Sequence, residues 1–467
     1  MLGPVLRFGL LVGIALPAGL GPGLGACARP TAAPARTTFS PAERLVVVVS
    51  VDGLPAYALR DPLVAAPTLR RLVREGATTS EGMRAINPTV TWPNHTTMAT
   101  GVTAIKHGVL FNGRLVRPGP RLPVRVEYRE RADLVRVPTL YDLADESGLR
   151  TAQVGWIPNQ IGGTITWGFP ERPQIEATLE REMVAAGFLE TKQLVDFREG
   201  PIAWRDQVWA DAASYIVTRY RPNLLYFHLL NLDATHHRYA PRTMAGAGAI
   251  ALADARIREL LDVIEHAGLM GRATVFVVSD HGFREVYRQI RANVALRAAG
   301  LIETSGVACD AWVVSAGGIA MVYVTNPERR AEIAAHAKAV LGGVEGIQHV
   351  VEPGQFAALG LPLPEANDQM GDLVLVAWPG YAFADGLDGD PVRVLPDGAA
   401  VGTHGYVASD PDMNATFIAW GYGIRPGVRL PGVNNVDVAP TVGALLGLTL
   451  PGSDGRVLRE MLVTRGP

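Results

Sequence analysis

Residues 87–101 read NPTVTWPNHTTMATG and contain Thr91, the position around which the rest of the chain can be organised. Two prolines favour turns in the first half of this stretch, and the residues after Thr91 have the pattern of a helix start. Thr91 is therefore expected at the positive end of a helix, where free backbone N–H groups favour an anion. A hydroxyl there is well placed to meet a phosphoryl or sulfuryl group, although this stretch alone favours a threonine that only caps the helix.

Three apolar runs, each followed by an aspartate, predict the fold. They are RLVVVVS at residues 44–50 before Asp52, NLLYFHLLNL at residues 223–232 before Asp233, and ATVFVVS at residues 273–279 before Asp280. Runs of this kind are typical of parallel strands covered on both faces. Helical patterns accompany them at residues 67–76, 138–148, 205–220 and 243–267. The sequence predicts an α/β fold with a central, mostly parallel sheet flanked by helices, in which the aspartates converge beyond the carboxyl ends of the strands.

Residues 283–401 differ in character from the segments on either side. They carry shorter patterns: a helix near residues 288–299, alternation at 312–324, a helix at 327–341 and the strand-like DLVLVAW at 372–378. We interpret this segment as a small α+β cap subdomain inserted between two pieces of a catalytic core, residues 44–282 and 402–467. Residues 156–173, rich in Gly, Pro and aromatic side chains, are expected to form a long surface loop near a ligand.

Residues 1–27 have the features of an export signal. One early arginine precedes a short apolar segment that is too interrupted by Gly and Pro to cross a bilayer. LGAC at residues 24–27 resembles a bacterial lipobox, in which Cys27 is lipidated; the alternative is ordinary cleavage and a soluble, secreted protein. Residues 28–43 are rich in Pro, Ala and Thr and are expected to be a linker. We expect a periplasmic or cell-envelope lipoprotein that contacts the membrane only through this lipid anchor.

The composition argues against partners that are recognised by bulk charge. The 467 residues carry 43 Lys and Arg against 45 Asp and Glu, a formal net charge of −2. Such a chain is not held to nucleic acid or anionic lipid by its overall charge, and no sequence-specific nucleic-acid-binding module is found. Cys27 and Cys309 are the only cysteines. Loss or lipidation of Cys27 leaves no partner for a disulfide, so Cys309 is expected to be a buried small hydrophobe.

Histidines lie beside the aspartates in a pattern that suits metal ions. Asp233 precedes His237 by four positions, Asp280 is adjacent to His281, and His404 is flanked by GTHG. Carboxylate oxygen and imidazole nitrogen without thiolate suit Zn²⁺ or a similar divalent ion such as Mn²⁺. With Asp52, six ligands are enough for two ions. His236 is interpreted as a neighbour of the metal site or a surface residue. Four other single histidines are interpreted as core or exposed residues: His228, His266, His336 and His349.

Six spaced motifs occur in an order that resembles a known family. They are VSVDG at 49–53, TVTWPNH at 89–95, GVLFN at 108–112, NLDATHH at 231–237, SDHG at 279–282 and GTHG at 402–405. From about residue 44 to the C-terminus, the chain resembles the type I phosphodiesterase/nucleotide pyrophosphatase family of the alkaline phosphatase superfamily. The resemblance implies an alkaline-phosphatase-like fold, two Zn²⁺ ions, and hydrolysis of phosphodiester or pyrophosphate bonds in a small molecule such as a nucleotide.

The resemblance also implies roles for individual residues. It implies two sets of zinc ligands: Asp233, His237 and His404, and Asp52, Asp280 and His281 together with Thr91. Thr91 is then the nucleophile that forms a phosphothreonine, and Asn112 donates a hydrogen bond to a phosphate oxygen. Trp92 stands where the family usually has Phe. Trp92, Phe111 and Trp156 are candidates for stacking on a base, although large aromatic side chains are as often plain packing.

Rival functions differ in what the sequence supplies. A sulfatase of the same superfamily needs Cys or Ser in a C/S-x-P-x-R setting, which neither Thr91 nor Cys309 has. A cofactor-independent phosphoglycerate mutase uses Ser and stays in the cytoplasm, which the export signal opposes. A phosphomonoesterase or phosphonate hydrolase remains an alternative, as does a non-catalytic binding module on the same fold. The substrate is left open among nucleotides, sugar nucleotides and lipid head groups.

Overall fold

The computed structural model describes residues 38–158, 162–396 and 401–463. The chain divides into two compact units, Met1–Thr38 and Phe39–Pro467, and the second unit contains nearly all of the described residues. The predicted signal at residues 1–27 and most of the predicted linker at 28–43 lie outside the described residues. Among the helices that are described, none has the length and apolar character needed to cross a membrane.

The central sheet of the second unit has eight strands in the order β20-β2-β19-β9-β1-β8-β6-β7. Strand β1 (Leu45–Val51) runs parallel to β8 (Leu224–Leu229) and to β9 (Ala273–Val278). The other strands are β2 (Ala77–Thr79), β6 (Thr151–Val154), β7 (Trp167–Phe169), β19 (Phe417–Gly421) and β20 (Val428–Leu430). Only β19 pairs antiparallel with its neighbours, β9 and β2, so the sheet is mostly parallel as the sequence predicts.

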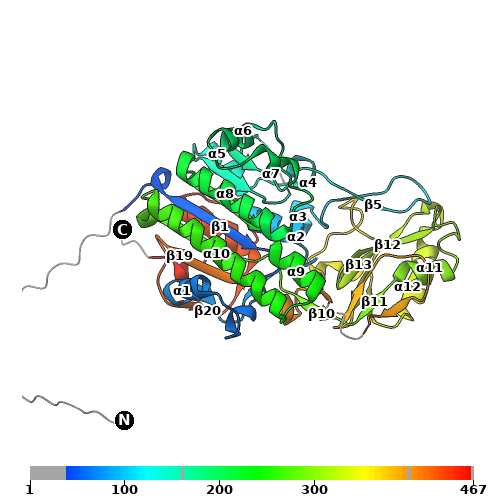
Figure 1. Ribbon diagram of the computed structural model, residues 1–467. Helices are drawn as coiled ribbons and strands as arrows, with labels where there is room; N and C mark the ends of the chain where they lie inside the picture. The colour runs from blue at the N-terminus through cyan, green and yellow to red at the C-terminus, as the bar shows by residue number, and fades with distance from the viewer. Residues whose placement is uncertain (1–37, 159–161, 397–400, 464–467) are drawn as a thin grey trace, which may run out of the picture. The chain divides into compact units, whose positions relative to one another are not determined.

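Helices cover both faces of this sheet because each central strand is apolar on both sides. Val47 and Val49 of β1 pack in one hydrophobic cluster, and Val46 and Val48 pack in another. The first cluster includes α1 (Pro67–Glu75), α8 (Ile202–Tyr220) and α10 (Met244–His266), and Figure 1 shows α8 and α10 lying along β1. The second cluster includes α2 (Thr91–Thr100), α5 (Leu140–Glu146) and α13 (Val438–Leu445).

The segment between residues 283 and 401 has a sheet and a hydrophobic cluster of its own (Figure 1, yellow to orange). Its antiparallel sheet has the order β12-β13-β15-β14, formed by Ala311–Ala316, Ile319–Val324, Leu373–Ala377 and Ile347–Val351. Helices α11 (Ala292–Ala298) and α12 (Arg330–Gly342) pack in the same cluster. The chain leaves the core through β10 (Arg284–Val286) and returns through β18 (Val401–Thr403), and these two strands pair antiparallel.

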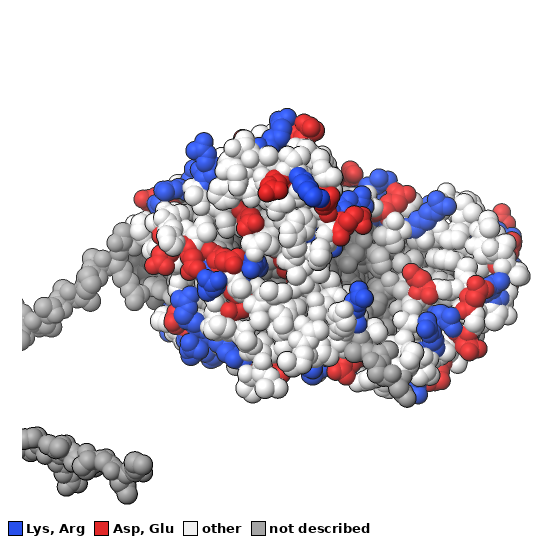
Figure 2. All heavy atoms as spheres, in the orientation of Figure 1, with Lys and Arg blue, Asp and Glu red and all other residues white. Residues whose placement is uncertain are grey.

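Shorter elements complete the described chain. The helices are α3 (Ala104–His107), α4 (Arg131–Leu134), α6 (Thr178–Ala185), α7 (Thr191–Val195) and α9 (Asn231–Tyr239). The strands are β3 (Met83–Arg84), β4 (Arg114–Val116), β5 (Arg125–Glu127), β11 (Arg288–Ile290), β16 (Tyr381–Phe383), β17 (Val392–Val394) and β21 (Val433–Asn434). On the face shown in Figure 2, acidic and basic side chains are interspersed, in keeping with the small net charge.

Three sequence expectations need correction. The apolar run at 223–232 is not one strand, because β8 ends at Leu229 and Asp233 lies in the first turn of α9. The helix expected from residue 288 begins at Ala292, since Arg288–Ile290 pairs with β16 and β17 as a strand. The expected loop at 156–173 contains β7, which extends the edge of the central sheet beside β6.

A buried histidine makes the stability of this fold depend on pH. His107 is 0% exposed; its Nδ1 accepts a hydrogen bond from the Val109 N–H at 3.1 Å, and its Nε2 lies 3.0 Å from Thr97 Oγ1. Burial lowers the pKa of His107 to about 3. Because this value lies below the ordinary pKa near 6.5, the neutral ring stabilises the fold above pH 6.5, and that stabilisation is lost as the pH falls towards 3.

We expect His107 alone to lower the free energy of unfolding by about 2 kcal/mol between pH 7 and pH 5. The measurement is urea unfolding at both pH values for the wild type, His107→Gln and the exposed control His266→Gln. The control should keep the full pH dependence and His107→Gln should lose this part of it. The same pH dependence in all three proteins would contradict the assignment.

Candidate active site

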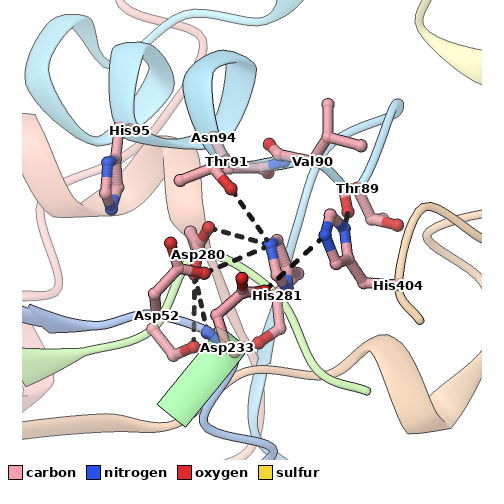
Figure 3. Close-up of polar contacts among 12 residues, drawn as sticks. Asp52, Thr89, Val90, Thr91, Asn94, His95, Asp233, Asp280, His281 and His404 are labelled. Carbon is pink, nitrogen blue, oxygen red and sulfur yellow. Dashed lines mark hydrogen bonds and ion pairs between the residues drawn. The ribbon is translucent and has the colours of Figure 1, made fainter. Parts of the chain in front are cut away.

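The carboxyl ends of the parallel strands bring the predicted acidic residues together. Asp52 directly follows β1, and Asp280 comes after β9 with one residue between them. Asp233 lies on α9, which follows β8. Figure 3 shows these three carboxylates around one space, with His281 and His404 beside them and Thr91 facing them from α2. The convergence predicted from the apolar runs is therefore present, although one carboxylate comes from a helix.

The six predicted ligands form two groups of three. Asp52, Asp280 and His281 make up the Asp52 triad, and Asp233, His237 and His404 make up the Asp233 triad. Within each triad, one ligand atom from every residue lies within 4.8 Å of the others. The imidazoles of His281 and His404 stack with ring centroids 3.7 Å apart, which places the two triads side by side.

A backbone carbonyl fixes the orientation of each of the three triad imidazoles. Nδ1 of His404 lies 2.9 Å from the Thr89 carbonyl, that of His237 lies 3.1 Å from the Gly402 carbonyl, and that of His281 lies 3.1 Å from the Gly282 carbonyl. Because a carbonyl only accepts, each Nδ1 carries the hydrogen and each Nε2 keeps its lone pair when the ring is neutral. Backbone contacts of this kind fix the tautomer of histidines that bind metals through Nε2.

The carboxylates supply a matching set of oxygen atoms. Asp52 Oδ1, Asp233 Oδ1 and Asp280 Oδ2 are buried and have no hydrogen-bond partner in the part of the chain that the structure describes. The Nε2 atoms of the triad histidines lie near these oxygens: His281 at 3.0 Å from Asp280 Oδ2, His237 at 3.5 Å and His404 at 3.7 Å from Asp233 Oδ1. Unpaired buried carboxylate oxygens cost free energy, and a divalent cation between such O and N atoms removes that cost. The donor set therefore fits one such cation in each triad.

Burial and mutual repulsion perturb the titration of this cluster. Burial, followed by the charges of Asp280 and Asp233, raises the pKa of Asp52 well above its usual value. Burial also raises the pKa of Asp233. Burial acts to raise the pKa of Asp280, but the electrostatic effect of His281, whose Nε2 lies 3.0 Å from Asp280 Oδ2, outweighs it and lowers this pKa. Burial also lowers the pKa of His404, so this ring is poorly suited to carry a charge that would offset the three carboxylates, and divalent cations meet that electrostatic demand.

The two triads differ in their access to solvent. The side chains of Asp52, Asp280 and His281 are 0% exposed, whereas those of His237, Asp233 and His404 are 42%, 14% and 10% exposed. The Asp52 triad is therefore the enclosed half of the site, and the Asp233 triad is the half that opens to solvent.

Thr91 is the first residue of α2 and does not cap it. The N-cap position is Val90, whose side chain makes no capping hydrogen bond. Thr91 Oγ1 lies 3.5 Å from His281 Nε2, and the residue is 5% exposed. The free N–H groups expected at this helix start are fewer than the sequence suggests, since Trp92 donates its N–H to Asn112 and Pro93 has none.

Asn112 is oriented by this same helix start. Its Oδ1 accepts the hydrogen bond from the Trp92 N–H at 2.9 Å. A backbone N–H can only donate, so the oxygen must face the helix and the NH₂ group is the end that remains for another acceptor. Asn112 is solvent-exposed, and its NH₂ group can therefore donate to an incoming phosphate oxygen.

The three aromatic candidates for substrate stacking lie in different settings. Trp156 is 2% exposed and stacks on His95 with ring centroids 4.2 Å apart, so the expectation that it stacks on a base is wrong. Trp92 is 6% exposed and packs with Val109, Leu134 and Ile157. Phe111 is half-buried, which makes it the aromatic ring of the three with the most surface left for a ligand.

The remaining histidines show where sequence interpretation held and where it missed a contact. His266, His336 and His349 are exposed. His236 is 2% exposed and packs edge-on against Phe283, outside both triads. His228 is in the core as expected, but its Nε2 lies 3.0 Å from Asp52 Oδ2. The signal that could have found it is a lone polar ring within an apolar strand that ends near an acidic site.

Comparisons with known proteins show which family the chain belongs to. A sequence model of the family "Type I phosphodiesterase / nucleotide pyrophosphatase" matches residues 46–407, so the chain belongs to that family. Bis(5'-adenosyl)-triphosphatase ENPP4 of Bos taurus is 22% identical over 411 residues, 86% of this chain and 78% of that protein. Venom phosphodiesterase 2 of Crotalus adamanteus is 22% identical over 247 residues, 52% of this chain and 27% of that protein.

A solved structure shares the fold. Murine ectonucleotide pyrophosphatase / phosphodiesterase 5 superposes with a TM-score of 0.68 at 18% sequence identity, covering 90% of this chain and all of that one. The predicted alkaline-phosphatase-like fold, with a large, mostly parallel sheet between helices, is confirmed.

Replacing one carboxylate should separate folding from metal binding. Asp52→Asn removes a buried charge from the repelling cluster but keeps the side-chain shape, so we expect the metal-free variant to unfold at the same temperature as the wild type or a higher one. Its affinity for Zn²⁺ should fall at least about tenfold because an amide is a poorer ligand than a carboxylate. Thermal unfolding with and without Zn²⁺ measures both effects, and an undiminished zinc-induced rise in the variant would contradict the ligand assignment.

Proposed function

We propose that this chain hydrolyses phosphodiester or phosphoanhydride bonds, with Thr91 as the nucleophile and two Zn²⁺ ions as cofactors, Mn²⁺ being the alternative metal. The observation that carries the proposal is the position of the Thr91 hydroxyl, 3.5 Å from His281 Nε2 and so at the edge of the Asp52 triad. Two relatives support it: ENPP4 of Bos taurus is named a bis(5'-adenosyl)-triphosphatase, and the murine structural neighbour was also solved as an inactive threonine-to-alanine variant in complex with AMP.

Each triad would hold one cation through its Nε2 and carboxylate atoms. The ions, when bound, supply Lewis acidity that makes a nearby hydroxyl easier to deprotonate and offsets negative charge on oxygen. The protein's own contribution is to hold Thr91 in place. Its position as the first residue of α2 fixes its backbone, and its burial excludes most competing water from the hydroxyl.

The residues then account for two displacement steps at phosphorus. Thr91 Oγ1 attacks, the bond from phosphorus to the leaving alcohol or phosphate breaks, and a phosphothreonine forms while the leaving group takes up a proton. Asn112 donates from its NH₂ group to a non-bridging oxygen in this step. Water then attacks phosphorus, the bond to Thr91 Oγ1 breaks, and the threonine hydroxyl regains a proton.

The charges around the site favour a diester over a monoester. Among the described residues, the ion pairs of the triad carboxylates are all with histidines, and no Lys or Arg takes part in them. Basic side chains are what a dianionic monoester needs to be bound preferentially. This observation ranks phosphodiesterase above the phosphomonoesterase alternative.

The nucleophile can be tested with a matched control on the same helix. Thr91→Ala should lower kcat on a chromogenic phosphodiester at least about 10³-fold because no other group can form the covalent intermediate. It should still bind Zn²⁺. The control Thr100→Ala removes a buried hydroxyl at the far end of α2 that donates to the Thr96 carbonyl and accepts from the Val102 N–H. Full turnover by Thr91→Ala, or an equal loss in both variants, would rule out this role for Thr91.

The substrate class is tested by comparing two nitrophenyl compounds. We expect kcat/KM for bis(p-nitrophenyl) phosphate to exceed that for p-nitrophenyl phosphate at least about tenfold, because no Lys or Arg pairs with the triad carboxylates in the described part of the chain. A preference for the monoester would support the phosphomonoesterase alternative. Binding of zinc and nucleotide with no turnover of either compound would support a non-catalytic binding module.

A further inference from the structure

A buried histidine that the proposed chemistry does not use lies directly behind the Asp52 triad. His228 belongs to β8, where it pairs with Ser50 of β1, and it is 2% exposed. Its Nε2 lies 3.0 Å from Asp52 Oδ2, and its Nδ1 lies 3.1 Å from the Gly155 carbonyl. The ring therefore lies between a backbone oxygen and one oxygen of a candidate metal ligand, and its Nε2 must carry a hydrogen to donate to Asp52 once that carboxyl is ionised.

A second buried ring supports the first. His95 is on α2, one turn after Thr91, and is 0% exposed. Its ring meets that of His228 edge to face with centroids 4.5 Å apart, and its other side stacks on Trp156. Its Nε2 lies 2.8 Å from Ser50 Oγ, so it also ties α2 to β1. In Figure 3, His95 and Thr91 extend from the same helix towards the carboxylates.

These contacts decide which oxygen of Asp52 is available. Oδ2 is occupied by His228, while Oδ1 has no hydrogen-bond partner among the described residues and lies 3.5 Å from His281 Nε2. The carboxylate cannot rotate without breaking the contact with His228. Asp52 is thus set to offer a single oxygen towards the triad, and Asp280 is held in the same manner by the Gly53 N–H, which donates to its Oδ1 at 3.2 Å.

We propose that His228, braced by His95, is a positioning residue that orients Asp52 towards the cation of the Asp52 triad. This inference rests on the proposed function, since it concerns the same metal site. Contacts of this type around metal ligands are commonly worth a factor of 10 to 100 in metal affinity. In the described part of the chain, no hydrogen bond, ion pair or ring contact joins His228 to the Asp233 triad, so the expected effect is confined to one of the two sites.

The competing explanation is that His228 only fills space in the core. An apolar ring or chain would fill that space without the cost of burying a polar imidazole. Packing alone therefore predicts that leucine serves as well as histidine for metal binding. Orientation predicts that leucine fails and that a side chain with an N–H donor restores the function.

The experiment measures Zn²⁺ binding by calorimetry and chelator competition on the intact protein, for the wild type, His228→Leu, His228→Gln and the control His107→Gln. The wild type should bind two Zn²⁺ per chain. His228→Leu should weaken one of the two sites by about 10- to 100-fold and leave the other unchanged. His228→Gln, whose amide can donate to Asp52 Oδ2, should recover most of the affinity. The control replaces an equally buried imidazole that contacts neither triad and should bind both ions normally.

Wild-type affinity at both sites in His228→Leu would overturn this inference and leave the proposed function intact. The inference would also be overturned if His228→Leu and His107→Gln each weakened Zn²⁺ binding at both sites to the same extent. A general loss of core packing would then explain the result. Failure of the wild type to bind any Zn²⁺ would overturn the proposed function and the inference together. Thermal unfolding of each metal-free variant provides the check that all four proteins are folded.

Discussion

Three carboxylates held close together in a largely buried site are the constraint on which the rest of this structure depends. The side chains of Asp52 and Asp280 are completely buried, and that of Asp233 is 14% exposed. Like charges at such distances oppose one another, and burial makes each charge more costly. The carboxylates can remain ionised together when positive charge is added, and the Nε2 lone pairs that face them suit a metal cation better than a lysine or arginine.

The fold meets this constraint with neighbouring strands and tight glycine turns. Parallel strands β1 and β9 end at the same edge of the sheet, where Asp52 and Asp280 follow them. Asp233 reaches this edge from α9, the helix that follows β8. Glycines in the two His-Gly motifs let the chain pass close to its surroundings. A Cβ at Gly282 would come within 1.9 Å of the Asp412 carbonyl oxygen, and one at Gly405, which has φ +81°, within 1.7 Å of the Ala316 carbonyl oxygen. These close approaches help to place His281 and His404, which precede the two glycines, in the site.

Much of this arrangement could be predicted from the sequence because it follows from local patterns. Apolar runs predict buried strands. In open α/β sheets ligands bind at the carboxyl ends of the parallel strands, so this edge of the sheet can be predicted as the site. The position of Asp233 on a helix was missed because Leu230 and Leu232 continue the apolar run beyond the end of β8. The burial of Trp156 and the contact between His228 and Asp52 could not be predicted, since both depend on which side chains meet across strands and helices.

The central claim is that each triad binds one divalent cation, and anomalous X-ray diffraction at the zinc edge tests it most directly. The account predicts two anomalous peaks per chain in crystals grown with Zn²⁺. One should lie among Asp52, Asp280 and His281, and the other among Asp233, His237 and His404. A single peak shared by both triads, or peaks only at surface residues, would contradict it.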